Sequence, residues 1–256
     1  ARVAIADVTS GLAQITVQGP RSRELLAAVT SADLSDAAFG FRHAAEIDLG
    51  FALGLCTRIT YVGELGYELF VPAEMAVAAY DEIVAAGEVH GLRHCGLKAL
   101  GSLRLEKAYR DYGHDIDNTD DPVEAGLGFA VAWDKAGGFL GRDALAARRD
   151  ALGGRPPTRR LVQVLLTDPE PMMVHAEVLR RDGIEVGYLR SASYGFTLGG
   201  AVGLAMVDAG LVEPGRAVDA EFLATGDWTV QVGNAIVPAR VSLAPMYDPR
   251  SERVRG

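Results

Sequence analysis

The 256-residue sequence contains little cysteine and no long apolar run. Cys56 and Cys95 are its only cysteines, and neither belongs to a Cys-x-x-Cys pair or to a spacing typical of metal ligands. Two cysteines are too few for a disulfide framework. No signal peptide is recognisable, and no apolar stretch reaches the roughly 20 residues that a membrane-spanning helix requires. We therefore expect a cytoplasmic protein that has no membrane partner.

Excess positive charge is also missing. The sequence carries 25 Lys and Arg against 34 Asp and Glu, a formal net charge of −9, and its basic residues are dispersed. Nucleic-acid partners are thereby excluded, because binding a phosphate backbone requires a basic surface. The hydrophobic content of 49% is sufficient for the core of one large domain or of two ordinary ones.

Several well-known site motifs are absent. The sequence has no Gly-x-Ser-x-Gly elbow, no P-loop and no Gly-x-Gly-x-x-Gly fingerprint, so serine-hydrolase, P-loop and dinucleotide-binding functions have no support. The segment DIDNTDD, residues 115–121, resembles a calcium loop, but it has Asp120 where that loop needs glycine and Gly126 where it needs the closing glutamate. His90 and His94 have the spacing of a zinc pair but no adjacent glutamate. We expect no metal site.

The first half of the chain combines strand and helix patterns. Residues 51–72 form the strongest strand signal, rich in aromatic and β-branched residues, and their glycines suggest a hairpin. Residues 113–126 read as an ordered polar loop. Further strands are predicted at residues 3–8, 15–17 and 127–133, and helices at residues 21–29, 73–86 and 97–112.

The second half has a different pattern. Residues 146–160 have the composition of a connector, with charge, two glycines and two prolines. From residue 161 onward, short apolar runs separated by turn residues recur at intervals of about ten residues, which is typical of a small β-barrel or sandwich. We predict an α+β protein: a mixed α/β domain over residues 1–145, a linker over 146–160 and a small all-β barrel over 161–256.

The segment YVGELGYELF, residues 61–70, places two carboxylates among glycines and aromatic residues. If Gly66 formed a bulge, Glu68 could reach the inner face of the sheet, where a carboxylate needs a partner such as the two parallel N–H groups of a planar heterocycle. Otherwise Glu64 caps a turn and Glu68 lies on a solvated face. Residue chemistry alone favours this second interpretation.

The segment SLRLEKAYR, residues 102–110, contains several charges at helical spacing. Glu106 and Arg110 have the i, i+4 spacing of an ordinary solvated helix pair. Arg104 lies among leucines, so we expect it to be buried and paired with a carboxylate, Glu64 or Glu124.

An ordered series of motifs then resembles one family along nearly the whole chain. The series is TVQGPRSRELL, RITYVGELGYELFVP, GLKALGSLRLEKAYRDYGHDIDNTDDPVEAGLGFAV, FLGRDAL, EVGYLRSASYGFTLGGAVGLAMV and APMYDPRSERVRG. It is similar to the glycine-cleavage T-protein (aminomethyltransferase) family. Within that family it most resembles the folate-binding C-terminal half of dimethylglycine oxidase, dimethylglycine dehydrogenase and sarcosine dehydrogenase.

The resemblance implies an enzyme of one-carbon transfer. Tetrahydrofolate would accept a one-carbon unit from an N-methylglycine or aminomethyl donor to give 5,10-methylenetetrahydrofolate. FAD would be present only if a separate or upstream oxidoreductase half exists, and that flavin domain or subunit is the implied partner. The resemblance implies that Glu68 takes the N–H groups of the pterin and that Tyr61 also holds the folate. It further assigns Glu64, Arg104 and Arg255 to folate binding.

Two departures from the family pattern qualify this implication. Leu100 stands where aminomethyltransferases usually carry an arginine, which favours the dehydrogenase or oxidase branch. The catalytic aspartate of the family lies in an N-terminal stretch that this sequence does not contain, so the α/β domain is expected to be incomplete at its N-terminus and no catalytic residue is assigned. The alternative function is a non-catalytic module that binds folate or a partner.

Overall fold

The computed structural model describes residues 2–256. The chain divides into two compact units. The first, here called the sheet unit, comprises the residues up to Leu100 together with Arg250–Gly256. The second, here called the barrel unit, comprises Gly101–Pro249. The last seven residues, Arg250–Gly256, follow the barrel in the sequence but belong to the sheet unit, which precedes the barrel.

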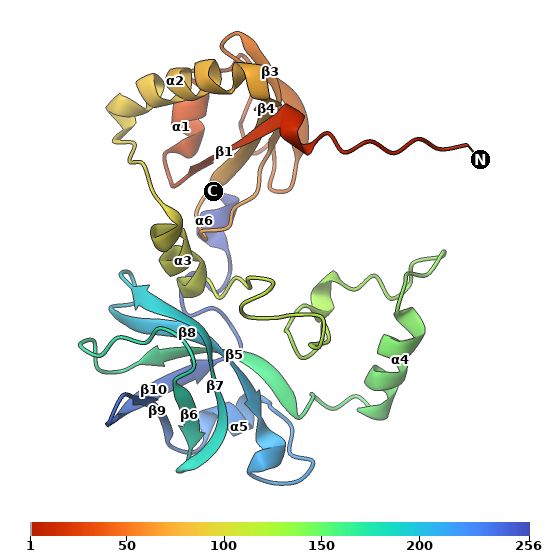
Figure 1. The fold of residues 1–256 in the computed structure, drawn as a ribbon, viewed down its shortest axis with the longest axis vertical. Helices are drawn as coiled ribbons and strands as arrows, with labels where there is room; N and C mark the ends of the chain where they lie inside the picture. The colour runs from red at the N-terminus through yellow and green to blue at the C-terminus, as the bar shows by residue number, and fades with distance from the viewer. Residues whose placement is uncertain (1) are drawn as a thin grey trace. The chain divides into compact units, whose positions relative to one another are not determined.

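The sheet unit is built on a four-stranded antiparallel sheet of order β1-β4-β3-β2 (Figure 1). Along β4, Tyr67, Leu69 and Val71 are buried, whereas Glu68 and Phe70 are half-buried on the opposite face. This alternation follows from the two-residue period of a strand. The strands are β1 (Leu12–Gln18), β2 (Ala44–Leu49), β3 (Ala52–Thr57) and β4 (Gly66–Pro72).

Two helices contribute to the core on the buried face of this sheet, α1 (Ser22–Leu26) and α2 (Ala76–Gly87) (Figure 1). In α2, Ala79 and Ile83 lie one turn apart and are buried in the core. A 3-10 turn over Glu88–His90 follows the helix and ends at Gly91, whose φ of 72° lies in the left-handed region that glycine favours. The third helix of this unit, α6 (Glu252–Arg255), is described below with the site.

The predicted hairpin is confirmed, and the bulge considered at Gly66 does not form. Strands β3 and β4 pair antiparallel, with Thr57 opposite Glu68. Gly66 pairs directly with Gln18 of β1 in an uninterrupted register, so it makes no bulge. Gly63 instead supplies the left-handed conformation in the connection, with φ of 79°. Glu68 consequently lies on the outer face of the sheet.

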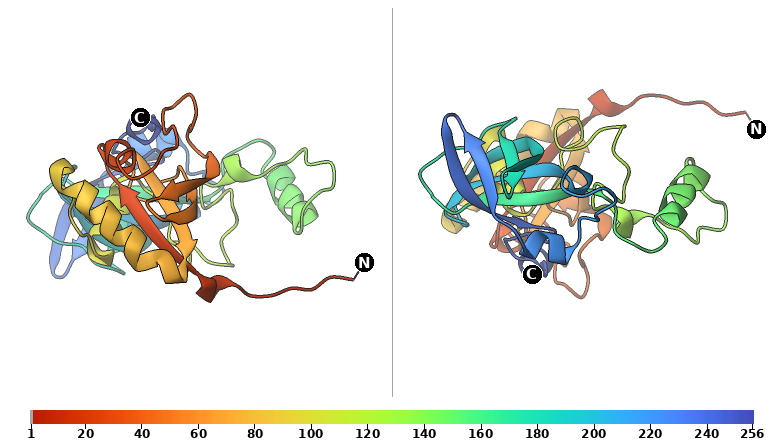
Figure 2. Two further views of the ribbon diagram at one scale, coloured as in Figure 1. Left: turned by 90° about the horizontal axis from the view of Figure 1, so that it is seen from above. Right: turned by 90° about the horizontal axis from the view of Figure 1, so that it is seen from below.

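The barrel unit confirms the predicted C-terminal fold, a closed antiparallel barrel of order β10-β5-β8-β7-β6-β9 (Figures 1 and 2). Its core is formed by inward-facing aliphatic residues, together with Phe222 and Trp228, whose rings pack edge to face. The strands are β5 (Arg159–Leu166), β6 (Val178–Arg181), β7 (Ile184–Gly195), β8 (Gly200–Asp208), β9 (Trp228–Val232) and β10 (Ala235–Ser242).

The remaining elements are short. The helices are α3 (Leu97–Glu106), α4 (Arg142–Ala151) and α5 (Ala220–Ala224). The 3-10 turns are η1 (Thr9–Gly11), η2 (Ala73–Met75), η3 (Glu88–His90), η4 (Gly128–Ala130) and η5 (Ala209–Leu211). Over residues 2–256, every helix is too short or too polar to cross a membrane.

Three of the predicted elements differ in the structure. Residues 3–8 are an exposed extended segment and not a strand, because no neighbouring strand pairs with them (Figure 2). Residues 127–133 form the turn η4 and not a strand. Helix α3 ends at Glu106 and not at residue 112, because Ala108 takes a left-handed φ of 55° that a helix cannot continue.

Helix α4 (Arg142–Ala151) overlaps the first part of the segment, residues 146–160, whose charge and glycine content suggested a connector. The sequence RDALAARRDA is rich in alanine, leucine and arginine, which favour helix, and this propensity outweighs the charge. The domain boundaries at residues 145 and 161 stay a prediction.

The two cysteines should differ strongly in reactivity. Cys56 on β3 is fully buried, and burial raises the pKa of its thiol to about 12, whereas Cys95 is exposed. Because the thiolate is the nucleophile, iodoacetamide at pH 8 should alkylate Cys95 in the folded protein and both cysteines only in guanidinium chloride. Peptide mass spectrometry measures the alkylated fraction of each cysteine. Rapid alkylation of Cys56 in the native protein would show that β3 is accessible.

Candidate functional site

The outer face of the sheet unit carries a single carboxylate on its central pair of strands. Glu68 stands on β4 directly between Thr16 of β1 and Thr57 of β3. Paired strands present directly opposed residues on the same face, so these three side chains form one row across the sheet. The next row places Phe70 between Gln14 and Leu55. A carboxylate thus adjoins an aromatic and aliphatic surface.

The Glu68 carboxylate makes no hydrogen bond or ion pair with any part of the chain that the structure describes. Its backbone takes part in the pairing with β1 and β3, and its carbonyl accepts a 3.4 Å hydrogen bond from Thr57 Oγ1. The residue is half-buried, and Leu55 in the neighbouring row is 42% exposed. A carboxylate held in this way can accept two parallel N–H groups from a planar ligand that rests on the apolar row.

Residues 58–65, here called the β3–β4 loop, lead into the strand that bears Glu68 and contain two of the predicted site residues, Tyr61 and Glu64. The loop has no regular secondary structure. The Glu64 carboxylate lies 4.0 Å from the guanidinium of Arg253 in α6. The end of the loop is held where Leu65 O accepts hydrogen bonds from Gly19 N at 2.8 Å and Ser22 Oγ at 3.2 Å.

A buried arginine that the sequence predictions missed begins this loop. The Arg58 guanidinium is 1% exposed and donates to Asp36 Oδ1 at 2.5 Å and to the Phe39 carbonyl at 2.9 Å. Arg23 donates to the same Asp36 oxygen at 2.5 Å. A signal was available in the sequence: Arg58 is a lone charge inside an apolar segment, and such a charge is normally buried with a partner.

The ionisation of Asp36 depends on these two arginines. Partial desolvation of the carboxyl acts to raise its pKa, but the hydrogen bonds and charges of Arg58 and Arg23 outweigh that effect and lower the pKa of Asp36 below its ordinary value. A lowered carboxyl pKa stabilises the folded state above the unfolded pKa, and that stabilisation is lost as pH falls through the folded value. The Arg23–Asp36–Arg58 contacts are therefore intact at neutral pH.

The sheet unit also contains Arg255, the C-terminal residue of α6. Its backbone carbonyl accepts a hydrogen bond from the Arg58 guanidinium, while the residue itself is exposed. Of the five residues assigned to folate binding, the structure therefore places four in one unit, and they are Tyr61, Glu64, Glu68 and Arg255.

Arg104 belongs to the barrel unit and is buried as expected, but its expected partners were wrong. Its guanidinium donates to the buried Asp115 carboxylate and, at 3.0 Å, to the Tyr109 carbonyl. Glu124 instead bonds Arg148, at 3.0 Å. The chain reverses direction after α3 and returns Asp115 beside Arg104, a path that sequence spacing does not reveal.

The predicted solvated pair of Glu106 and Arg110 is also wrong. Glu106 is 1% exposed, and its Oε1 accepts hydrogen bonds from the backbone N–H groups of Thr197 and Leu198 at 2.7 and 2.8 Å. Arg110 lies beyond the end of α3 and donates to the Ala125 carbonyl at 3.0 Å. Glu106 thus holds the β7–β8 hairpin through charge-assisted bonds.

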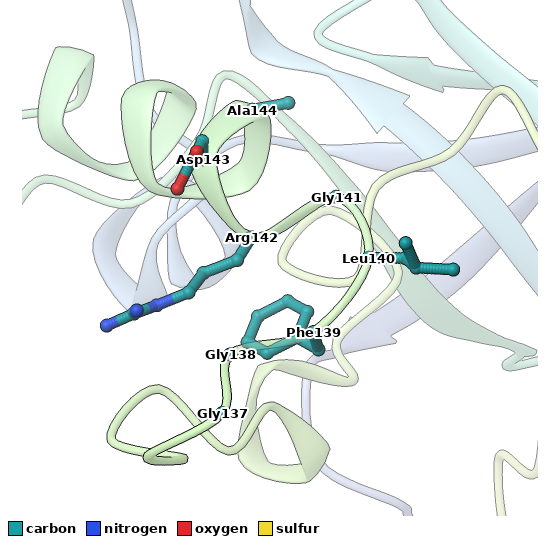
Figure 3. Close-up of a pocket in the computed structure, with 8 residues that line it drawn as sticks. All are labelled: Gly137, Gly138, Phe139, Leu140, Gly141, Arg142, Asp143 and Ala144. Atoms are coloured by element: carbon teal, nitrogen blue, oxygen red, sulfur yellow. The ribbon is translucent and has the colours of Figure 1, made fainter. Parts of the chain in front are cut away.

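Other features of the surface offer no better site. Over residues 2–256, no three His, Cys, Asp or Glu side chains are grouped as metal ligands would be. His90 Nδ1 lies 2.9 Å from an Arg21 nitrogen, and His94 Nδ1 lies 3.0 Å from the Tyr80 hydroxyl. An open concavity at residues 137–144 is lined by that one continuous segment and contains none of the predicted site residues (Figure 3).

The fold of this chain matches a known structure. The glycine cleavage system aminomethyltransferase T from Bartonella henselae superposes with a TM-score of 0.62, covering 92% of this chain and 84% of that protein, at 17% sequence identity. The mixed α/β unit and the closed six-stranded antiparallel barrel are therefore those of the T-protein fold.

Family profiles agree over most of the sequence. The GCVT N-terminal domain matches residues 1–135, and the glycine cleavage T-protein C-terminal barrel domain matches residues 159–248. The chain belongs to the glycine-cleavage T-protein family, whose aminomethyltransferase members are folate-dependent enzymes.

Characterised relatives come from two groups. The chain is 45% identical over 253 residues to 4-methylaminobutanoate oxidase (formaldehyde-forming) of Paenarthrobacter nicotinovorans and 36% identical over 251 residues to human mitochondrial sarcosine dehydrogenase. These alignments cover 99% and 98% of this chain but only 29% and 26% of those proteins. It is also 35% identical over 220 residues to the aminomethyltransferase of Geobacillus kaustophilus, covering 86% of this chain and 59% of that protein.

Proposed function

We propose that this chain is the folate-binding part of a one-carbon-transfer enzyme. Tetrahydrofolate would accept a carbon at the oxidation level of formaldehyde from an N-methylamine donor and leave as 5,10-methylenetetrahydrofolate. The observation that carries the proposal is the half-buried Glu68 carboxylate, which has no partner among residues 2–256 and lies beside an apolar row on an open sheet face. Family membership supplies the ligand class.

The residues of the sheet unit fit a reduced pterin. Its pyrimidine ring is planar, the edge of that ring presents N–H donors, and its face can rest on Phe70 and Leu55, whose row adjoins that of Glu68. An ionised carboxylate that accepts two such donors gives both orientation and charge-assisted bonds. Tyr61 and Glu64 on the β3–β4 loop would complete the site.

The remaining assignments stay predictions from the resemblance. Arg255 would contact the folate from α6. The Arg104 guanidinium is already bonded to Asp115 and to the Tyr109 carbonyl, so any folate contact would have to share these donors.

The contribution of this chain to the reaction would be positioning. When bound, tetrahydrofolate supplies the nucleophilic amines that take up the carbon. Glu68 would fix the orientation of the ring, and the half-buried sheet face would limit its hydration. No acid or base of this chain is assigned to the transfer itself.

The donor is proposed from the relatives' names. Sarcosine dehydrogenase and 4-methylaminobutanoate oxidase are both named for amines that carry an N-methyl group. This chain spans less than a third of either protein. Because it lacks a Gly-x-Gly-x-x-Gly fingerprint, amine oxidation by FAD would belong to another domain or subunit that delivers the carbon to this one.

A second candidate is a non-catalytic folate-binding module, favoured by the absence of an assigned catalytic residue. Incubating the chain with tetrahydrofolate and formaldehyde separates the two functions. An enzyme should accelerate the formation of 5,10-methylenetetrahydrofolate above the spontaneous rate, whereas a binding module should leave that rate unchanged.

Glu68→Gln tests the site directly. The amide keeps the size of the side chain but loses the charge and one acceptor, so we expect tetrahydrofolate affinity to fall by about 1–3 kcal/mol, measured by isothermal titration calorimetry. Glu74→Gln, at an exposed position of η2 outside the sheet, is the matched control and should leave affinity unchanged. Equal affinity of the Glu68→Gln variant and the unsubstituted chain would exclude Glu68 from the site.

A further inference from the structure

The C-terminal segment Arg250–Gly256 is docked in the sheet unit by apolar and polar contacts. Val254 is 2% exposed. The carbonyl of Arg255, at the end of α6 where helix carbonyls lack internal partners, accepts a hydrogen bond from Arg58. At Gly256, an added Cβ would lie 3.0 Å from Arg23 Nη2 and 3.1 Å from Arg58 Nη2, so this end fits closely against the same arginines.

These contacts reach the β3–β4 loop at two points. Arg58 is the first residue of the loop, and its guanidinium joins two separate segments: the turn that contains Asp36 and the Phe39 carbonyl, and α6 through the Arg255 carbonyl. Further along the loop, Glu64 faces Arg253 at 4.0 Å. That second pair is solvent-exposed on one side, where an ion pair contributes little. Arg58 and Val254 are the buried residues among these contacts.

We propose that the segment Arg250–Gly256 is a latch that sets the conformation of the β3–β4 loop, with Arg58 and Val254 as positioning residues for folate binding. The inference rests on the proposed function, because the loop carries Tyr61 and Glu64. Without regular secondary structure, the loop depends on its anchors. At its start the latch adds the Arg255 carbonyl to the bonds that Arg58 makes with Asp36 and the Phe39 carbonyl.

The affinity for folate should depend on the fraction of molecules in which the segment Arg250–Gly256 is docked. If undocking lets the loop adopt other conformations, only a fraction of molecules can bind, and the apparent dissociation constant rises by the inverse of that fraction. The folded sheet would be retained, since its core residues on β4 do not depend on α6. Loss of the latch would thus weaken folate binding without unfolding the sheet unit.

Val254→Ala is the test, with Val71→Ala as matched control. Both remove the same atoms from a buried valine of the sheet unit, but Val71 lies in the core of β4. We expect Val254→Ala to weaken tetrahydrofolate binding by about three- to tenfold and to speed hydrogen exchange at residues 59–65. Val71→Ala should leave tetrahydrofolate binding and hydrogen exchange at residues 59–65 unchanged. Val254→Ile, which keeps a large side chain at this position, should also retain the affinity and slow exchange of the unsubstituted chain.

The outcomes are distinguishable from failure of the proposed function. If the unsubstituted chain does not bind tetrahydrofolate, the proposed function fails, while faster exchange at residues 59–65 in Val254→Ala would still support the latch. If the unsubstituted chain binds and Val254→Ala resembles Val71→Ala in affinity and exchange, the latch is wrong. Should Val254→Ala not fold, Arg58→Lys replaces it, because a compact ammonium cannot span acceptors that two separate guanidinium nitrogens reach. Arg93→Lys, at an exposed position, is its control.

Discussion

Replacing Asp115 by alanine is expected to destabilise the barrel unit by about 3–5 kcal/mol, because it leaves the buried Arg104 guanidinium without its counter-charge. The side chains of Arg104 and Asp115 are 7% and 0% exposed. Asp115 Oδ2 also accepts a 2.7 Å hydrogen bond from Asp111 N, so the substitution removes a second bond. Urea unfolding followed by tryptophan fluorescence measures the loss, since Trp133 and Trp228 both belong to the barrel unit.

Two further variants identify the cause of that loss. Asp150→Ala removes the partner of Arg149 in an exposed pair, 50% and 69% accessible, and should change stability by less than about 0.5 kcal/mol. The double variant Arg104→Met with Asp115→Leu removes both charges and should be more stable than Asp115→Ala alone. If the double variant is less stable than Asp115→Ala, the unpaired charge is not the source of the destabilisation.

Gly187→Ala should be comparably damaging, through packing. Gly187 on β7 pairs with Val207 of β8 and with Leu179 of β6, and an added Cβ would lie 2.1 Å from the backbone oxygen of Met206. A backbone oxygen in a closed barrel cannot withdraw without disturbing the ladder on both sides. We expect a loss of about 3 kcal/mol or more, measured by thermal unfolding with circular dichroism.

Gly66→Ala is the matched comparison for this effect. Its Cβ would lie even closer to another atom, 1.8 Å, but that atom is Oε1 at the end of the flexible Gln18 side chain. Gln18 can rotate away, so the expected cost is below about 1 kcal/mol. A larger loss for Gly66→Ala than for Gly187→Ala would show that distance alone, and not the mobility of the contacted atom, decides the outcome.

Features encoded over short distances could be predicted from the sequence. The β3–β4 hairpin follows from an apolar and aromatic run interrupted by glycines, and the barrel follows from regularly spaced short runs. Helix α2 follows from its apolar spacing. Each of these signals lies within one window of neighbouring residues. The isolated run at residues 3–8 failed because a strand also needs a partner.

Charged contacts between distant segments could not be predicted. Glu106 bonds backbone groups 91 and 92 residues away, and Arg58 bonds the carbonyl of a residue 197 positions later. Charge alone placed Glu106 on a solvated surface, since backbone N–H partners have no sequence signature. For Glu68, the sequence pattern did not determine on which face of the sheet the side chain lies. The uninterrupted pairing of Gly66 with Gln18 places it on the outer face.

The return of Arg250–Gly256 to the sheet unit also has a consequence for protein synthesis. A ribosome makes the rest of that unit first and the whole barrel next, so the Arg58 guanidinium has no Arg255 acceptor until the residue 197 positions later has been synthesised. The nascent sheet unit therefore leaves the ribosome without Arg250–Gly256, and its packing is completed only after the barrel unit has been synthesised. The docking of this seven-residue segment is therefore the last step in assembling the sheet unit.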